Sequence, residues 1–114
     1  MRVQTRALLI DKASSATISD VYINGNCDVL GIQVSGTFSS ATIKAQGVVD
    51  ADSTDWVDIG AIDLADMSAK KSGITAKGVY EIPIESLYKI RVNVTAVSGG
   101  NVSVFGQFAD TANA

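Results

Sequence analysis

Alternation of apolar and polar residues is the feature that most constrains how this chain can fold. In residues 87–97 the apolar positions recur at every second residue, and Lys, Arg, Asn and Thr lie between them. A two-residue period places successive side chains on opposite faces of a β-strand. We therefore predict a half-buried strand whose inward face holds Tyr88, Ile90, Val92, Val94 and Ala96.

Short polar segments separate the alternating stretches and have the chemistry of tight turns. Residues 98–101 read Ser-Gly-Gly-Asn and precede a second alternating stretch at 102–108. Residues 39–40 are Ser-Ser and lie between alternating stretches at 29–38 and 41–49. Because a short polar turn commonly joins two antiparallel strands, we predict two β-hairpins. The inward residues expected in the first hairpin are Leu30, Ile32, Val34, Phe38, Ile43, Ala45 and Val49.

Shorter strands are predicted before the Asn24-Gly25 turn, at 56–59 and at 78–82. The last of these ends at the only proline, which stops the strand or places it at a sheet edge. We expect a loop at 62–71, where β-branched residues are scarce. About seven or eight short strands without a long amphipathic helix predict an all-β chain folded as an antiparallel β-sandwich or jelly roll.

The length of the chain predicts a single domain, because 114 residues can bury a core of their own. We expect the sandwich core at 16–108, an N-terminal arm or first strand at 1–12, and a C-terminal tail at 109–114, with extended arms at both ends. Leu8, Leu9 and Ile10 are apolar without an evident place in the core, so we predict that they bind a partner.

Composition argues against several classes of function. Charged residues make up only 18% of the chain and hydrophobic residues 46%, which suits a surface that is covered on assembly. A net charge of -3 without a basic run argues against nucleic-acid binding. The absence of His removes the usual nucleophile–base pairs and imidazole ligands, so we expect no enzyme, no metal and no cofactor. The apolar run at 7–10 is too short for a signal peptide or a membrane span, so we expect no membrane partner.

Acidic residues gather around the single tryptophan and form a candidate ligand loop made of Asp52, Asp55, Trp56 and Asp58. Alternating carboxylates suit calcium, but the glycine and the closing glutamate of an EF-hand loop are missing. We favour an acidic turn in which Asp side chains bond to their own backbone.

Two rival functions would use the same region. A carbohydrate-binding module would use Trp56 with Asp55, Asp58 and Tyr22, because aromatic rings stack on sugars. A metal-dependent enzyme would combine the carboxylates of the loop with Glu81.

Several phrases of the sequence resemble small β-sandwich structural proteins of tailed bacteriophages and prophages. They are LGIQVSGTF at 30–38, ATIKAQG at 41–47, DSTDWV at 52–57, GVYEI at 78–82 and LYKIRV at 87–92. The resemblance implies a virion component of the capsid decoration, head-fibre-base or neck and tail accessory kind. It further implies synthesis in the bacterial host cytoplasm, self-association with a trimer favoured, and binding to a major capsid, neck or tail protein.

Overall fold

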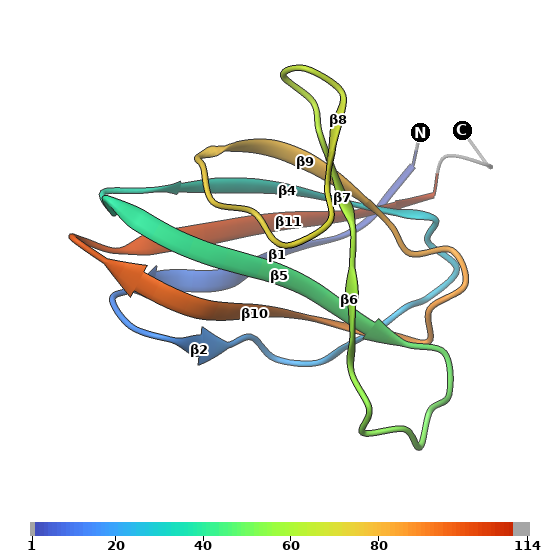
Figure 1. Ribbon diagram of the computed structural model, residues 1–114. Coiled ribbons are helices and arrows are strands. Elements are labelled where there is room, and N and C mark those ends of the chain that lie inside the picture. The colour runs from blue at the N-terminus through green and yellow to red at the C-terminus, as the bar shows by residue number, and fades with distance from the viewer. Residues whose placement is uncertain (1, 111–114) are drawn as a thin grey trace.

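The alternating segments form two antiparallel sheets that face each other across one core (Figure 1). The computed structural model describes residues 2–110 and the side chains of residues 6–110. The six-stranded sheet has the order β1 (Arg2–Ala13), β11 (Val102–Asp110), β4 (Val29–Gly36), β9 (Gly78–Pro83), β7 (Ala61–Asp63) and β8 (Ser68–Lys70). The five-stranded sheet has the order β2 (Thr17–Ile18), β10 (Lys89–Ser98), β5 (Ser40–Val48) and β6 (Val57–Ile59), and β3 (Tyr22–Ile23) also pairs with β10. The predicted β-sandwich is confirmed, with more strands than expected because several are only two or three residues long.

The core consists of the inward side chains of both sheets. Strand β4 contributes Leu30, Ile32 and Val34, and β10 contributes Val92 and Val94, all of them almost fully buried. Every second residue of β4, and of β10 as far as Val94, faces the opposite sheet, which is the arrangement that the alternation predicted.

Both predicted hairpins are wrong. Strands β4 and β5 lie in different sheets, and so do β10 and β11. The pairs that form are β4 with β11 and β5 with β10. Each short polar segment is therefore an arch that carries the chain from one sheet to the other. A hairpin and an arch bury the same alternate residues, so alternation cannot distinguish them.

The loops of the two arches lie against each other at one end of the sandwich. The N–H groups of Thr37 and Phe38 both donate to the carbonyl oxygen of Asn101, at 2.9 and 3.1 Å. Gly100 has a φ of 140°, and a Cβ at this position would lie 2.5 Å from the carbonyl oxygen of Thr37. The close approach of the two loops therefore requires glycine.

Residues 1–12 were expected to be either an N-terminal arm or a first strand. From Arg2 onward this segment is a strand of the sandwich. Strand β1 pairs antiparallel with β11 and forms one edge of the six-stranded sheet. At the other terminus, Ala109 and Asp110 belong to β11 and not to a tail, because they continue the pairing with β4 and β1. The remainder of the predicted tail, 111–114, lies outside the described residues.

Three residues expected to face inward are exposed: Val49, Tyr88 and Ala96. The first two lie just outside β5 and β10, where strand alternation has ended. In β10, a register shift after Val94 reverses the alternation, and Val97 packs against the core in place of Ala96.

The region predicted as a loop at 62–71 contains the hairpin of β7 and β8, which projects from the body of the sandwich in Figure 1. Its turn closes with a hydrogen bond of 2.7 Å from the N–H of Met67 to the carbonyl oxygen of Asp63. Met67 has a φ of 61°, a conformation that turns usually assign to Gly or Asn, so the sequence carried no turn signal there. Strand β9 ends at its proline as predicted and lies between β4 and β7, not at an edge. Among the described residues, no helix is long and apolar enough to cross a membrane.

Candidate functional site

The outer face of the six-stranded sheet carries a row of apolar side chains that the core does not use. Leu8, Phe105 and Val79 come from β1, β11 and β9 and are 47%, 47% and 46% exposed. Strand register places them in one line across the sheet, with Gln33 of β4 between Phe105 and Val79. Large apolar side chains gathered on one open face are typical of surfaces that bind other molecules, so this row is the candidate site.

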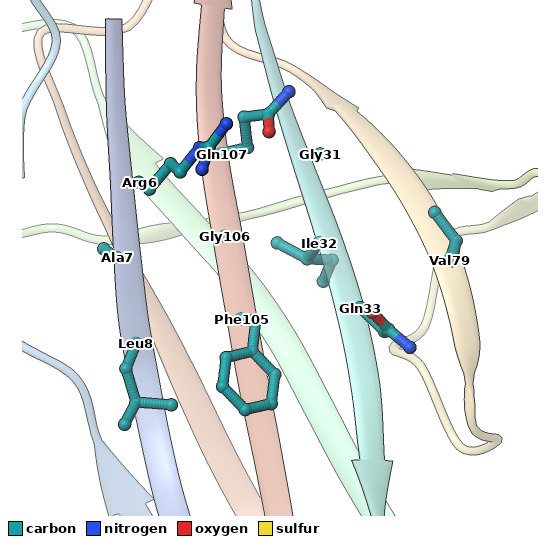
Figure 2. Close-up of a pocket in the computed structure, with 10 residues that line it drawn as sticks. All are labelled: Arg6, Ala7, Leu8, Gly31, Ile32, Gln33, Val79, Phe105, Gly106 and Gln107. Carbon is teal, nitrogen blue, oxygen red and sulfur yellow. The ribbon is translucent and has the colours of Figure 1, made fainter. Parts of the chain in front are cut away.

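A second row lies beside the first and is polar. It consists of Arg6 in β1, Gln107 in β11, Gly31 in β4 and Glu81 in β9, again aligned by strand register. Gly31 has no side chain, so bare backbone is left beside Gln107 (Figure 2). The two rows border a shallow hollow of about 640 Å³.

Of the three residues predicted to bind a partner, only Leu8 lies on this outer face. Leu9 and Ile10 are buried in the core, at 7% and 4% exposed. The register between β1 and β11 shifts between Leu8 and Ile10, and this irregularity lets two consecutive side chains face inward. The expectation that Leu9 and Ile10 lack a place in the core is therefore wrong.

The remaining residues of the face were missed, although one signal was available. Inward positions 102, 104, 106 and 108 leave Phe105 pointing outward, and an aromatic ring at an outward position is unusual in a solvated strand. Its neighbours on the face could not be found in this way, because they come from strands distant in the sequence.

The candidate ligand loop is held by local turn bonds. The N–H of Asp52 donates to Oδ1 of Asp50 at 3.0 Å, and the N–H of Asp55 donates to Oγ of Ser53 at 3.1 Å. Such bonds are typical of acidic turns, which is the interpretation that the sequence favoured. Within the part of the chain that the structure describes, no group of three or more His, Cys, Asp or Glu residues is placed to hold a metal ion.

Asp58 lies apart from that loop, in β6, and belongs to a polar network on the outer face of the five-stranded sheet. Gln46 donates to its Oδ1 at 2.8 Å, and the Lys44 ammonium lies 3.2 Å from its Oδ2. The hydrogen bond from Gln46 is the largest cause that lowers the pKa of Asp58 below its ordinary value. Burial opposes this effect, and the contact with Lys44 lowers the pKa further. Arg91 completes the network by donating to Oε1 of Gln46 at 2.9 Å.

Trp56 packs against cations of the same face. The Arg91 guanidinium carbon lies 4.3 Å from the centre of the Trp56 ring, and the Lys89 ammonium lies 5.4 Å from it. Tyr22, the second aromatic residue of the proposed sugar site, packs on Phe108 with ring centres 5.6 Å apart and belongs to the core. The two rings therefore do not share a face.

The carboxylates that a metal-dependent enzyme would combine are also kept apart. Glu81 pairs with Gly31 and Ile62 in the six-stranded sheet. Asp52 and Asp55 lie in the loop that joins β5 to β6 of the five-stranded sheet.

A family model named XepA matches residues 4–108 of the chain. No curated protein sequence matches the chain. Among solved structures, the SPBc2 prophage-derived protein YomS is similar over 91% of this chain and 90% of its own, with 22% identity and a TM-score of 0.81.

A second similar structure is the PBSX exported protein XepA, with 19% identity and a TM-score of 0.82. The similarity covers 91% of this chain but only 37% of that one, so the chain spans little more than a third of that protein. At these identities the two structures establish a shared fold.

Proposed function

The chain belongs to the XepA family, and from this premise we propose that it is a non-catalytic structural component of a phage particle. In this role it associates with its own copies and with a major capsid, neck or tail protein. Capsid decoration or a head-fibre base is the role that the sequence resemblance favours. The virion is the proposed location, after synthesis in the cytoplasm of the bacterial host.

Two observations from relatives support a phage origin. The solved structure that matches along nearly its whole length is described as prophage-derived, and the larger one is described as an exported PBSX protein. Both adopt the same sandwich, which supplies broad outer faces for contact with other proteins.

The observation that carries the proposal is the exposed apolar row of Leu8, Phe105 and Val79. Each of these side chains keeps nearly half of its surface exposed to water. The inward residues of the same strands form the core, so the core does not cover this row. A contact that covers this row would gain stability from apolar burial.

Mass spectrometry of purified particles tests the proposal. Density-gradient particles from an induced lysogen should contain the protein at many copies per particle, whereas host cytosolic proteins should be removed. The double variant Leu8→Ser with Phe105→Ser should be depleted from particles. The matched control Val57→Ser, which changes an exposed apolar residue of the other sheet, should be retained. Absence of the wild-type protein from particles would overturn the proposal.

The geometry does not favour a carbohydrate-binding module. Sugar stacking needs an open aromatic face, whereas the Trp56 ring is in contact with Arg91 and Tyr22 is directed to the core.

A further inference from the structure

We propose that Asn24 and Gly25 form a deamidation site that the folded protein keeps closed and that opens when the chain unfolds. Conversion of Asn24 to aspartate or isoaspartate then prevents the chain from refolding. The site thus removes unfolded molecules irreversibly from the folding equilibrium. This inference goes beyond the proposed function and does not depend on it, because it concerns the chemistry of one dipeptide.

Asn24-Gly25 is the only Asn-Gly dipeptide in the sequence. Asparagine deamidates fastest before glycine, because the backbone nitrogen that attacks the side chain has no neighbouring Cβ to hinder it. In the folded chain Gly25 is exposed, and no heavy atom lies within 4 Å of the position that a Cβ would occupy. Gly25 itself is therefore open to water, and protection must come from the bonds of Asn24.

The reaction consumes water and needs no other reagent. The backbone nitrogen of Gly25 attacks the side-chain carbon Cγ of Asn24, and its proton leaves with Nδ2 as ammonia. A bond forms between that nitrogen and Cγ, and the bond between Cγ and Nδ2 breaks, which closes a succinimide ring. Water then opens the ring at Cγ to give aspartate, or at the backbone carbonyl carbon to give isoaspartate.

The fold holds the nitrogen that must leave. Nδ2 of Asn24 lies 3.0, 2.9 and 3.1 Å from the carbonyl oxygens of Cys27, Ile84 and Leu87. On the other side of the amide, Oδ1 accepts a hydrogen bond of 3.0 Å from the N–H of Cys27. Ring closure turns the amide group toward the nitrogen of Gly25 and makes Cγ tetrahedral, so it must break these bonds.

Release of the amide requires two connections of the sandwich to separate. Ile84 and Leu87 lie between β9 and β10, whereas Asn24 lies between β3 and β4. The backbone N–H of Asn24 also donates to the carbonyl oxygen of Tyr88 at 2.8 Å. Both connections lie at the end of the sandwich opposite the two arches (Figure 1). Since bonds to three carbonyl groups cross between them, the site opens only when this end of the sandwich comes apart.

The hydrogen bonds predict the size of the protection. The two protons of Nδ2 serve three carbonyl groups, so with the bond to Oδ1 the amide makes about three full hydrogen bonds. Each such bond contributes a factor of about five to an equilibrium constant, and three contribute about a hundredfold. Asn24 of the folded protein should therefore deamidate about a hundredfold more slowly than in an open chain.

The product no longer fits the folded site. An aspartate in place of Asn24 has only acceptor oxygens, and one of them would face the three carbonyl oxygens that Nδ2 now serves. Isoaspartate also lengthens the main chain by one carbon, which displaces the turn relative to Tyr88. We therefore expect the modification to lower the folding equilibrium constant at least about a hundredfold.

Deamidation rates of the folded protein and of an open chain test the closed state. The open reference is a synthetic peptide of residues 18–30 in the same mildly alkaline buffer. After digestion at acid pH, tandem mass spectrometry measures conversion at Asn24 and distinguishes it from conversion at Asn26. The folded protein should react about a hundredfold more slowly than the peptide. Protection below about tenfold, or faster conversion of Asn26 than of Asn24 in the peptide, would overturn the proposal.

Refolding after incubation in guanidinium tests the loss of refolding. Wild-type protein that is held unfolded should lose refolding yield in proportion to the converted fraction of Asn24. Gly25→Ala is the matched control, because its methyl group hinders the attacking nitrogen while the position has open space and no positive φ. This variant should fold normally and keep its refolding yield over the same incubation. Full refolding of converted wild-type chains, or equal loss in both proteins, would contradict the inference.

Two substitutions isolate the effect of the product. Asn24→Asp copies the aspartate product and should lower the folding equilibrium constant at least about a hundredfold in guanidinium titrations. Asn26→Asp is the matched control, because Asn26 is exposed and its φ of 67° suits aspartate as well as asparagine. It should change the constant less than about threefold. Equal effects of the two substitutions would refute the proposal, whereas failure of Asn24→Asp to fold would support it.

Discussion

Asn24 joins two loops at one end of the sandwich, and Asn24→Ala should destabilise the protein by about 3 kcal/mol. Its side-chain Nδ2 lies 3.0 Å from the carbonyl oxygen of Cys27, 2.9 Å from that of Ile84 and 3.1 Å from that of Leu87. Its Oδ1 accepts from the N–H of Cys27 at 3.0 Å. One amide group thus ties its own turn to the connection between β9 and β10.

The magnitude follows from these bonds. The two protons of Nδ2 serve three carbonyl groups, so the four contacts amount to about three full hydrogen bonds at about 1 kcal/mol each. Asn24 is half-buried, so water can reach part of the site in the variant and the full desolvation cost does not apply. An unfolding entropy of about 0.24 kcal/mol/K for 114 residues converts about 3 kcal/mol into a fall in Tm of about 12 °C.

Urea denaturation followed by circular dichroism measures the change, with Asn93→Ala as the matched control. Asn93 makes a single long hydrogen bond of 3.5 Å to Gln46 on the outer face, so its loss should cost less than about 0.5 kcal/mol. A loss below about 1 kcal/mol for Asn24→Ala would refute the reasoning. It would show that water replaces the amide without cost and that the two loops are not held together by this side chain.

Three further predictions concern the backbone and the surface network. Gly100→Ala should destabilise by more than about 2 kcal/mol in denaturant titrations, whereas Gly31→Ala should be neutral or slightly stabilising; equal effects would contradict the close packing of the arches. Met67→Gly should raise the stability by about 0.5 kcal/mol, because relief of the left-handed conformation exceeds the entropic cost of glycine. A fall in Tm would instead reveal a stabilising contact of the Met67 side chain. Asp58→Asn should lower Tm at pH 7. Because the folded-state pKa of Asp58 is lowered, its contribution is complete above the ordinary value of 3.8 and is lost as pH falls through the folded pKa, so the variant and wild-type Tm values should converge once the pH lies below the folded pKa.

Only part of the candidate site could be predicted from the sequence, because its residues come from strands that are distant in the chain. Leu8 could be selected from the sequence because an apolar run without a core role is visible locally. Its neighbours Phe105 and Val79 come from strands about a hundred and about seventy residues away in the chain. A patch assembled from distant strands has no signature in any one of them, so only the strand order could reveal it.

The sequence by itself determined which residues of most strands face inward, because a period of two is a property of each strand alone. It therefore predicted the all-β class, the sandwich and most of the core, including Leu30, Ile32 and Val34. The tertiary structure decided how the strands pair, since an arch and a hairpin bury the same alternate residues and differ only in the sheet that receives the returning strand. In the arches that form, the two loops are in close contact, and the backbone of Gly100 lies against Thr37. The same pairing places β1 beside β11, and so decides that Leu9 and Ile10 lie in the core while Leu8 remains on the outer face.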